Sequence, residues 1–82
     1  MAKPLQGLTV AILATDNFEQ VELTGPKDAL EQAGATVRIL SATAGRIRGM
    51  KHDEKADSFK VDLSWDDAEP GDFASAIPAM RR

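Results

Sequence analysis

Residues 8–41 read LTVAILATDNFEQVELTGPKDALEQAGATVRILS and contain the pattern that decides the fold. The first run, Leu8–Ala14, is apolar at almost every position, as expected for a central strand covered on both faces of a parallel sheet. A helical stretch follows up to Ala33, and Thr36–Ser41 is rich in β-branched residues, which favours a second strand. Strand, helix and strand in this order predict a right-handed βαβ unit, and therefore an α/β fold.

Local signals at both ends predict the limits of the helix between these strands. Its apolar face is expected to contain Pro26, Ala29, Leu30 and Ala33, which recur at helical spacing. Gly34 follows directly and is expected to stop the helix in a left-handed conformation. Thr24 is expected to cap the segment after it, and Pro26 to start or bend the helix because proline cannot donate to the preceding turn.

The next segment predicts an antiparallel hairpin. Ala44 and Gly45 are expected to form a turn, with Arg46–Met50 as a short strand returning from it. Phe59–Leu63 alternates apolar and polar residues, which is typical of a half-buried antiparallel strand. The expected order is therefore a βαβ unit followed by a hairpin.

The last segment carries weaker signals. Ser64 is followed by a tryptophan and two aspartates, which favours an N-cap with acids in a first helical turn. Phe73–Ile77 has a weak strand pattern that Pro78 ends, and Trp65 is expected to pack against the hairpin.

Length and composition limit the function classes. The chain has 82 residues, a formal net charge of −3, one histidine and no cysteine. This composition predicts one domain at most, no metal site, no cofactor and no thiol chemistry within the chain itself. The chain lacks a long apolar run and a clear signal peptide, so we expect no membrane association and a cytoplasmic location.

The stretch Ala14–Gly34, ATDNFEQVELTGPKDALEQAG, resembles the opening motif of the ThiJ/PfpI superfamily. The likeness is to its intracellular protease I-like branch, within the class I glutamine amidotransferase-like fold. That branch has an apolar first strand, an Asp-x-Phe-Glu-x-x-Glu loop and a helix containing proline. The positions that match are Asp16, Phe18, Glu19, Glu22 and Pro26.

The resemblance extends through the hairpin and covers roughly residues 7–73. The segments GMKHD (49–53), DSFKVD (57–62) and DDAEPGDF (66–73) are similar to the same branch. The tail at 74–82, ASAIPAMRR, diverges where the family continues with a strand ending in Pro-Gly-Gly. The resemblance therefore implies that residues 1–82 are the N-terminal part of a single PfpI-like domain, a partial, truncated doubly wound (flavodoxin-like) parallel sheet.

Glu19 is the one family active-site residue that the resemblance places in this chain. In the family this acid hydrogen-bonds a nucleophilic cysteine, which here would lie beyond Arg82. Glu19 is therefore expected to be a vestigial acid partner of a missing cysteine, and the chain to be inactive alone. The family's proposed activities are peptidase, glyoxalase III-like and deglycase reactions linked to stress protection, and its members commonly form oligomers.

Other interpretations of the charged residues remain open. Glu19 and Glu22 could form a paired-carboxylate acid/base site, although Glu22 is expected to be structural or an oligomer contact. His52 is expected to be a solvated loop residue. The basic hairpin residues, which are expected to protect a strand edge and not to bind nucleic acid, are Arg46, Arg48, Lys51 and Lys55.

Three functions are consistent with the sequence: a truncated and inactive family member, an oligomerisation or binding module completed by a partner chain, and an enzyme that uses carboxylates alone. The substrate is not indicated. Without further strands beside it, Leu8–Ala14 is expected to keep an open edge, so we expect the isolated chain to fold poorly, to aggregate or to associate with itself.

Overall fold

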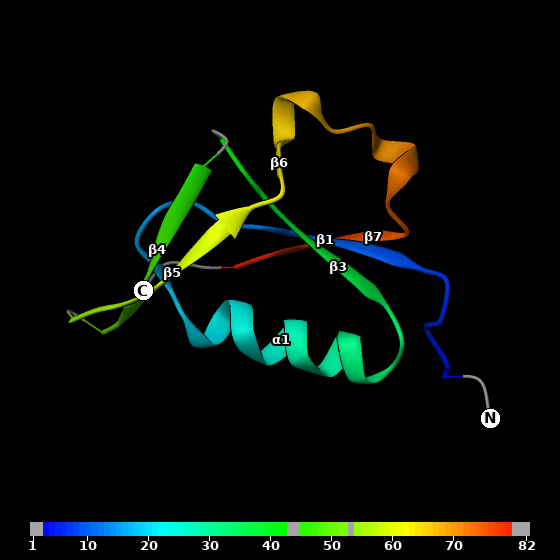
Figure 1. Cartoon of the computed structure of the whole chain (residues 1–82), viewed down its shortest axis with the longest axis horizontal. Coiled ribbons are helices and arrows are strands. Elements are labelled where there is room, and N and C mark those ends of the chain that lie inside the picture. The colour runs from blue at the N-terminus through cyan, green and yellow to red at the C-terminus, as the bar shows by residue number, and fades with distance from the viewer. Residues whose placement is uncertain (1–2, 43–44, 53, 80–82) are drawn as a thin grey trace.

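The computed structural model describes residues 3–42, 45–52 and 54–79, and in these it shows one α-helix and two β-sheets (Figure 1). The strands are β1 (Thr9–Leu13), β2 (Phe18–Glu19), β3 (Thr36–Ser41), β4 (Gly45–Lys51), β5 (Glu54–Val61), β6 (Leu63–Ser64) and β7 (Ser75–Pro78). The helix is α1 (Val21–Gln32), and two 3-10 helices are η1 (Trp65–Asp67) and η2 (Pro70–Asp72). The larger sheet has the order β6-β3-β1-β7 with parallel neighbours, and the smaller sheet has the order β2-β4-β5. The predicted α/β class with a parallel sheet and a hairpin is confirmed.

β1 lies in the interior of the larger sheet, as its apolar sequence predicts. β3 pairs with one of its edges and β7 with the other, and Ile12 in its middle is fully buried. The expectation that Leu8–Ala14 has an open edge is therefore wrong. β7 pairs with β1 despite its weak strand pattern, since Val10, Ala11 and Ile12 offer it a regular parallel partner. The unpaired edge on this side of the sheet belongs to β7.

The ends of α1 agree only in part with the sequence signals. Gly34 follows the C-cap residue with φ +101°, the left-handed conformation expected of a helix stop. Thr24 is not the N-cap, because α1 already begins at Val21 and the Thr24 hydroxyl donates to the main-chain oxygen of Gln20. Pro26 lies inside the helix instead of starting it.

The buried face of α1 is centred one turn earlier than the spacing predicts. Leu23, which is fully buried, is the main contact of the helix with the core. Leu30 packs against the same core, whereas Ala29 is exposed.

β4 and β5 form the predicted antiparallel hairpin, with a bulge between Arg48 and Met50. The stretch Phe59–Leu63, predicted to be a single strand, is divided between two sheets. Its first part ends β5, and Leu63 begins β6, which pairs in parallel with β3. Of the turn predicted at Ala44 and Gly45, Ala44 is outside the described residues, and Gly45 already belongs to β4.

The connection from β6 to β7 contains the two 3-10 helices. The Ser64 hydroxyl accepts a hydrogen bond from the main-chain N–H of Asp66, so the predicted N-cap is confirmed, although the helix that it caps is a single 3-10 turn. Trp65 is 37% exposed and is not part of the buried core.

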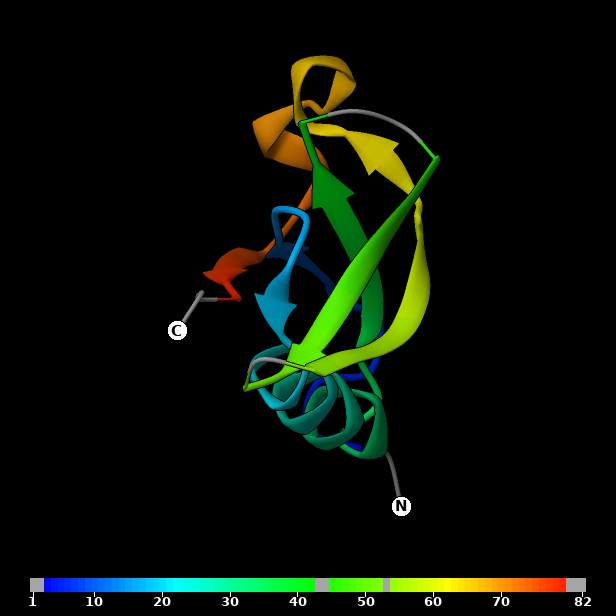
Figure 2. The same cartoon turned by 90° about the vertical axis from the view of Figure 1, so that its left-hand side faces the viewer.

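The core lies between one face of the larger sheet, α1 and the hairpin. The buried cluster joins sheet residues such as Ile12 and Ile39 with Leu23 of α1, Ile47 of β4 and Val61 of β5. Figure 2 shows the hairpin beside β2 and above α1. The η1–η2 connection is far from α1 in Figure 1. None of the helices in the described ranges is long and apolar enough to cross a membrane.

Candidate functional site

Glu19 is the charged side chain that the structure buries most deeply. It is 7% exposed and is the one charged residue in the buried class among residues 3–42, 45–52 and 54–79. Its carboxylate oxygens accept hydrogen bonds from the main-chain N–H of His52, at 3.2 Å for Oε1 and 3.4 Å for Oε2. A carboxylate removed from water is costly unless it is hydrogen-bonded, so this contact helps to keep Glu19 inside.

The short strand β2 carries Glu19 at the carboxyl ends of the parallel strands. Phe18, the other residue of β2, is fully buried in one cluster with Ala14 and Ala79. Ala14 directly follows β1, and Ala79 directly follows β7. Open parallel sheets bind their ligands at this edge, outside the carboxyl ends of the strands. The acid therefore lies where a ligand of the sheet would be expected.

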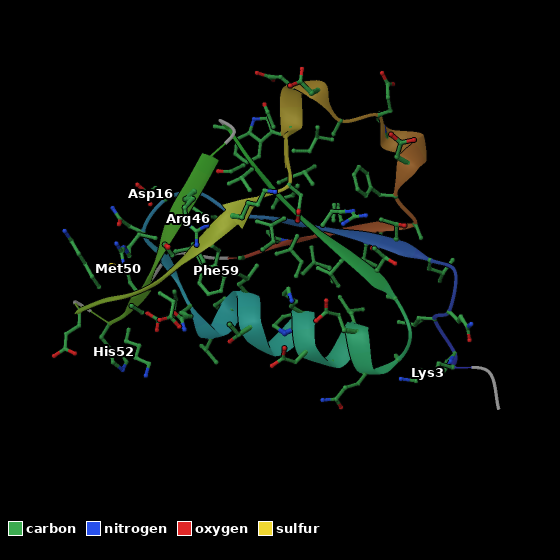
Figure 3. The ribbon with its side chains drawn as sticks, viewed as in Figure 1. Lys3, Asp16, Arg46, Met50, His52 and Phe59 are labelled. Carbon is green, nitrogen blue, oxygen red and sulfur yellow. The ribbon has the colours of Figure 1, made fainter. Side chains whose placement is uncertain are left out.

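The segment before β2 is attached to β4 by Asp16. Its Oδ1 atom accepts hydrogen bonds from the main-chain N–H of Arg48, at 2.7 Å, and of Asn17, at 3.2 Å. Asn17 has φ +64°, a conformation that asparagine tolerates better than most residues. Figure 3 shows Asp16 near the hairpin that carries Arg46 and Met50. Asp16 is thus a structural member of the motif that holds the acid-bearing segment in place.

Gln20 attaches the other end of β2 to the hairpin. Its Nε2 atom donates to Asp57 Oδ2 at 3.0 Å, and its Oε1 atom accepts from the main-chain N–H of Asp57 at 2.9 Å. The Gln20 side chain passes over Gly49. A Cβ atom at Gly49 would lie 2.9 Å from Gln20 Oε1 and 3.2 Å from Phe59 Cε2, so the Gln20 side chain would have to shift to make room for it.

Glu22 does not share the surroundings of Glu19. It is exposed in the first turn of α1, where a negative charge is favoured by the helix dipole. The structure therefore does not support a paired-carboxylate site made by Glu19 and Glu22, because one is buried against His52 and the other faces solvent.

His52 is exposed in the turn after β4, at φ +56°. Its side chain was expected to be a solvated loop residue, but its main-chain N–H contacts Glu19, which sequence reasoning missed. Histidine is among the residues enriched at positive φ, which fits its place at the hairpin turn, but no local signal in the sequence indicates the contact with Glu19. Within the described ranges, no group of three or more His, Cys, Asp or Glu residues could hold a metal ion.

Two of the basic residues of the hairpin, Arg46 and Arg48, bind across it. Arg46 donates to the hydroxyl and the main-chain oxygen of Ser58, and Arg48 donates to the main-chain oxygen of Ala56 at 2.7 Å. These contacts stabilise the pairing of β4 with β5.

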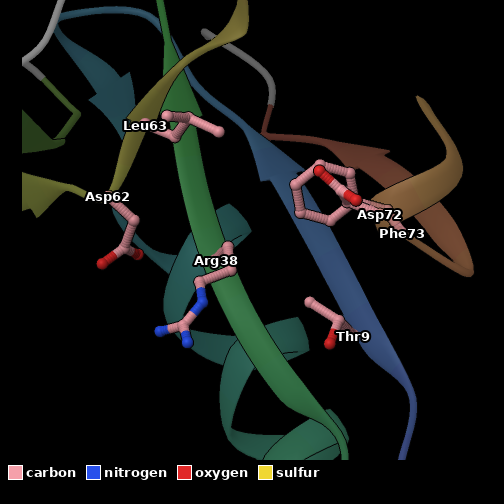
Figure 4. Close-up of a pocket in the computed structure, with 6 residues that line it drawn as sticks. All are labelled: Thr9, Arg38, Asp62, Leu63, Asp72 and Phe73. Carbon is pink, nitrogen blue, oxygen red and sulfur yellow. The ribbon is translucent and has the colours of Figure 1, made fainter. Parts of the chain in front are cut away.

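A pocket of about 310 Å³ opens on the other face of the larger sheet (Figure 4). It is lined by Thr9, Arg38, Asp62, Leu63, Asp72 and Phe73. The side chains of Thr9 and Arg38 alternate along their strands with Val10 and Val37, and Val37 belongs to the core cluster with α1. The pocket is therefore separated from Glu19 by the sheet.

Comparison with known proteins gives a consistent picture. The model of the DJ-1/PfpI family matches residues 8–77. An uncharacterized protein of Staphylococcus epidermidis is 44% identical over 68 residues, which is 83% of this chain and 38% of that protein. A Bacillus subtilis protein named "Putative cysteine protease YraA" is 39% identical over 68 residues, again 83% of this chain and 38% of that protein.

A solved structure gives the same fold. The crystal structure of a ThiJ/PfpI domain protein from Brachyspira murdochii superposes with a TM-score of 0.79 at 18% identity, covering 88% of this chain and 40% of that one. The chain thus spans about two fifths of the length of the relatives and the structure that it matches.

Proposed function

Because this chain belongs to the DJ-1/PfpI family, we propose that it supplies the acid-bearing part of a cysteine-dependent site, with Glu19 as the acid. The observation that carries this proposal is the burial of Glu19 directly after Phe18, which shares a buried cluster with Ala14 and Ala79 at the carboxyl ends of β1 and β7. A carboxyl group in that position can hydrogen-bond a thiol on a neighbouring strand and tune its reactivity. The name of the Bacillus subtilis relative, which mentions a cysteine protease, is consistent with this chemistry.

The 82-residue chain contains no cysteine, so we propose that it has no thiol-dependent activity by itself. Peptidase, glyoxalase-type and deglycase reactions all remain candidate activities of a completed site. The 82-residue chain and its Glu19→Gln variant are assayed in parallel with peptides and with methylglyoxal as substrates. We expect no turnover with either chain. Turnover that falls in Glu19→Gln would instead support an enzyme that uses carboxylates alone.

A chimera tests the role of Glu19. The matching 68 residues of this chain replace the corresponding segment of the Bacillus subtilis relative, and the rate at which iodoacetamide alkylates the cysteine is measured. Glu19→Gln is expected to lower this rate by about tenfold, because the thiol loses the group that tunes it. Glu22→Gln, at the exposed acid three residues away, is the control. Equal rates for the two variants would contradict the proposal.

A second candidate function is a module completed by a partner chain, and the free edge of β7 favours it. Among the residues that the structure describes, β7 pairs with β1 on one side only, and an unpaired strand edge can accept a further strand. The partner would be a second copy or a chain carrying the complementary strands. Light scattering after size exclusion tests this idea, with the chain alone and with the chain mixed with the C-terminal part of the Bacillus subtilis relative. A chain that stays strictly monomeric in both samples would contradict it.

A further inference from the structure

The bulge of the β4–β5 hairpin is occupied by the side chain of Gln20. Pairing is regular up to Arg48↔Ser58 and resumes at Met50↔Lys55, so the ladder is interrupted in between. A bulge leaves main-chain groups without their ladder partners. Here the N–H of Asp57 donates to Gln20 Oε1, and the Asp57 carboxylate accepts from Gln20 Nε2. One amide side chain therefore supplies an acceptor for the main-chain N–H of Asp57 and a donor for the Asp57 carboxylate.

The strand that carries Glu19 is too short to define its own register. β2 pairs with β4 through Phe18↔Gly49 and Glu19↔Met50 alone. A shift of one residue would turn each side chain to the opposite face, which would remove Glu19 from His52 and Phe18 from the core. Burial of Phe18 already favours this register, and contacts outside the two-residue strand reinforce it.

Gln20 is better suited to this task than Asp16. Asp16 accepts from a main-chain N–H of β4, and such groups recur along the whole strand. Gln20 bonds to the bulge, which interrupts the hairpin at one place, and it crosses Gly49, where a side chain would block it. Because Gln20 immediately follows Glu19 in the chain, its hydrogen bonds to Asp57 also restrain the position of Glu19.

We propose that Gln20 is a positioning residue for Glu19, and that its pairing with Asp57 selects the register in which the Glu19 carboxylate meets the His52 N–H. The importance of this role for chemistry rests on the proposed function of Glu19. The positioning itself is a property of the 82-residue chain and is measured without any turnover.

The test is hydrogen exchange of the His52 amide, followed by NMR in the full 82-residue chain. Glu19→Ala calibrates the rate when the carboxylate is absent. Gln20→Met keeps the size of the side chain without its amide, and is expected to raise the His52 exchange rate by about tenfold toward the Glu19→Ala value. The amides of Ile12 and Ile39 report on the core and are expected to keep the parent rate.

Exchanging the amide and the carboxylate between positions 20 and 57 distinguishes loss of the Gln20–Asp57 pairing from general destabilisation of the fold. Gln20→Glu places two carboxylates together and is expected to raise the His52 rate, whereas Asp57→Asn, which can still accept from Gln20, is expected to leave it unchanged. In the combined variant, the amide introduced at position 57 can donate to the carboxylate introduced at position 20, so the donor and the acceptor are exchanged between the two positions. The His52 exchange rate is expected to return to that of the parent chain.

An unchanged His52 rate in Gln20→Met, or no recovery in the combined variant, would overturn the proposal. If Gln20→Met does not fold, the comparison of Gln20→Glu with the combined variant decides. A negative result in the exchange experiment would not contradict the proposed role of Glu19 in a cysteine-dependent site. A negative result in the alkylation experiment would not contradict the positioning of Glu19 by Gln20.

Discussion

Ile39 and Asp62 are joined in both directions, since the main-chain N–H of Asp62 donates to the oxygen of Ile39, and the N–H of Ile39 donates to Asp62 Oδ2, each at 2.8 Å. These two bonds lie where the chain leaves the hairpin and enters the larger sheet as β6. One aspartate thus links the two sheets on which the candidate site depends.

Removing this carboxylate is expected to destabilise the whole fold. Asp62→Ala leaves the N–H of Ile39 without its acceptor, and should lower the free energy of unfolding by about 1 kcal/mol. Asp67→Ala, at an exposed acid of η1, is the control and should have little effect. Urea unfolding followed by circular dichroism measures both, and equal midpoints would show that the Asp62 side chain does not stabilise the junction.

The addition of a side chain at Gly49 is expected to destabilise the fold. Gly49→Ala would place a Cβ atom 2.9 Å from Gln20 Oε1 and 3.2 Å from Phe59 Cε2, and should cost about 1–3 kcal/mol in the free energy of unfolding. Gly71→Ala, which meets nothing within 4 Å, is the matched control.

The cost at Gly49 should depend on Gln20. In a Gly49→Ala, Gln20→Ala double variant, the combined loss is expected to be smaller than the sum of the two single losses, because Gln20 Oε1, the atom nearest to the new Cβ, is gone. Strict additivity in the unfolding experiment would mean that Gln20 and Gly49 do not interact.

Leu23 is expected to be the most sensitive position of α1. It is fully buried, and Leu23→Ala should cost about 2–5 kcal/mol, through lost burial and the cavity left behind. Because a chain of this length has a small free energy of unfolding, Leu23→Ala should already be unfolded at 25 °C and should show no cooperative transition on heating. Val21→Ala, at a 64% exposed residue of the same helix, should change little. A sharp transition retained in Leu23→Ala would contradict the central place of Leu23 in the core.

Glu19 should contribute to stability through its hydrogen bond to His52. Glu19→Ala removes the acceptor and should cost about 1 kcal/mol, whereas Glu19→Gln keeps an oxygen for the same N–H and should cost less. The two variants are compared by urea unfolding with Glu69→Ala, an exposed acid whose side chain makes no cap hydrogen bond, as control. Equal losses in the three variants would show that the carboxylate is held by something other than His52.

The sequence alone determined the βαβ unit, because its signals are local. An apolar run such as Leu8–Ala14 predicts a buried parallel strand wherever it lies, and Gly34 stops a helix by its own backbone freedom. The Asp-x-Phe-Glu-x-x-Glu spacing likewise indicated the family and Glu19 before any contact was known.

Only the tertiary structure decided the surroundings of Glu19 and the edges of the sheet. His52 lies 33 positions after Glu19, and Asp57 lies 37 positions after Gln20, so no local pattern could bring either pair together. β7 has a weak pattern of its own and becomes a strand because β1 offers it a partner. Local propensity predicts the elements with strong patterns, whereas long-range hydrogen bonds and packing decide the weak ones and the contacts between elements, and the candidate site consists of such contacts.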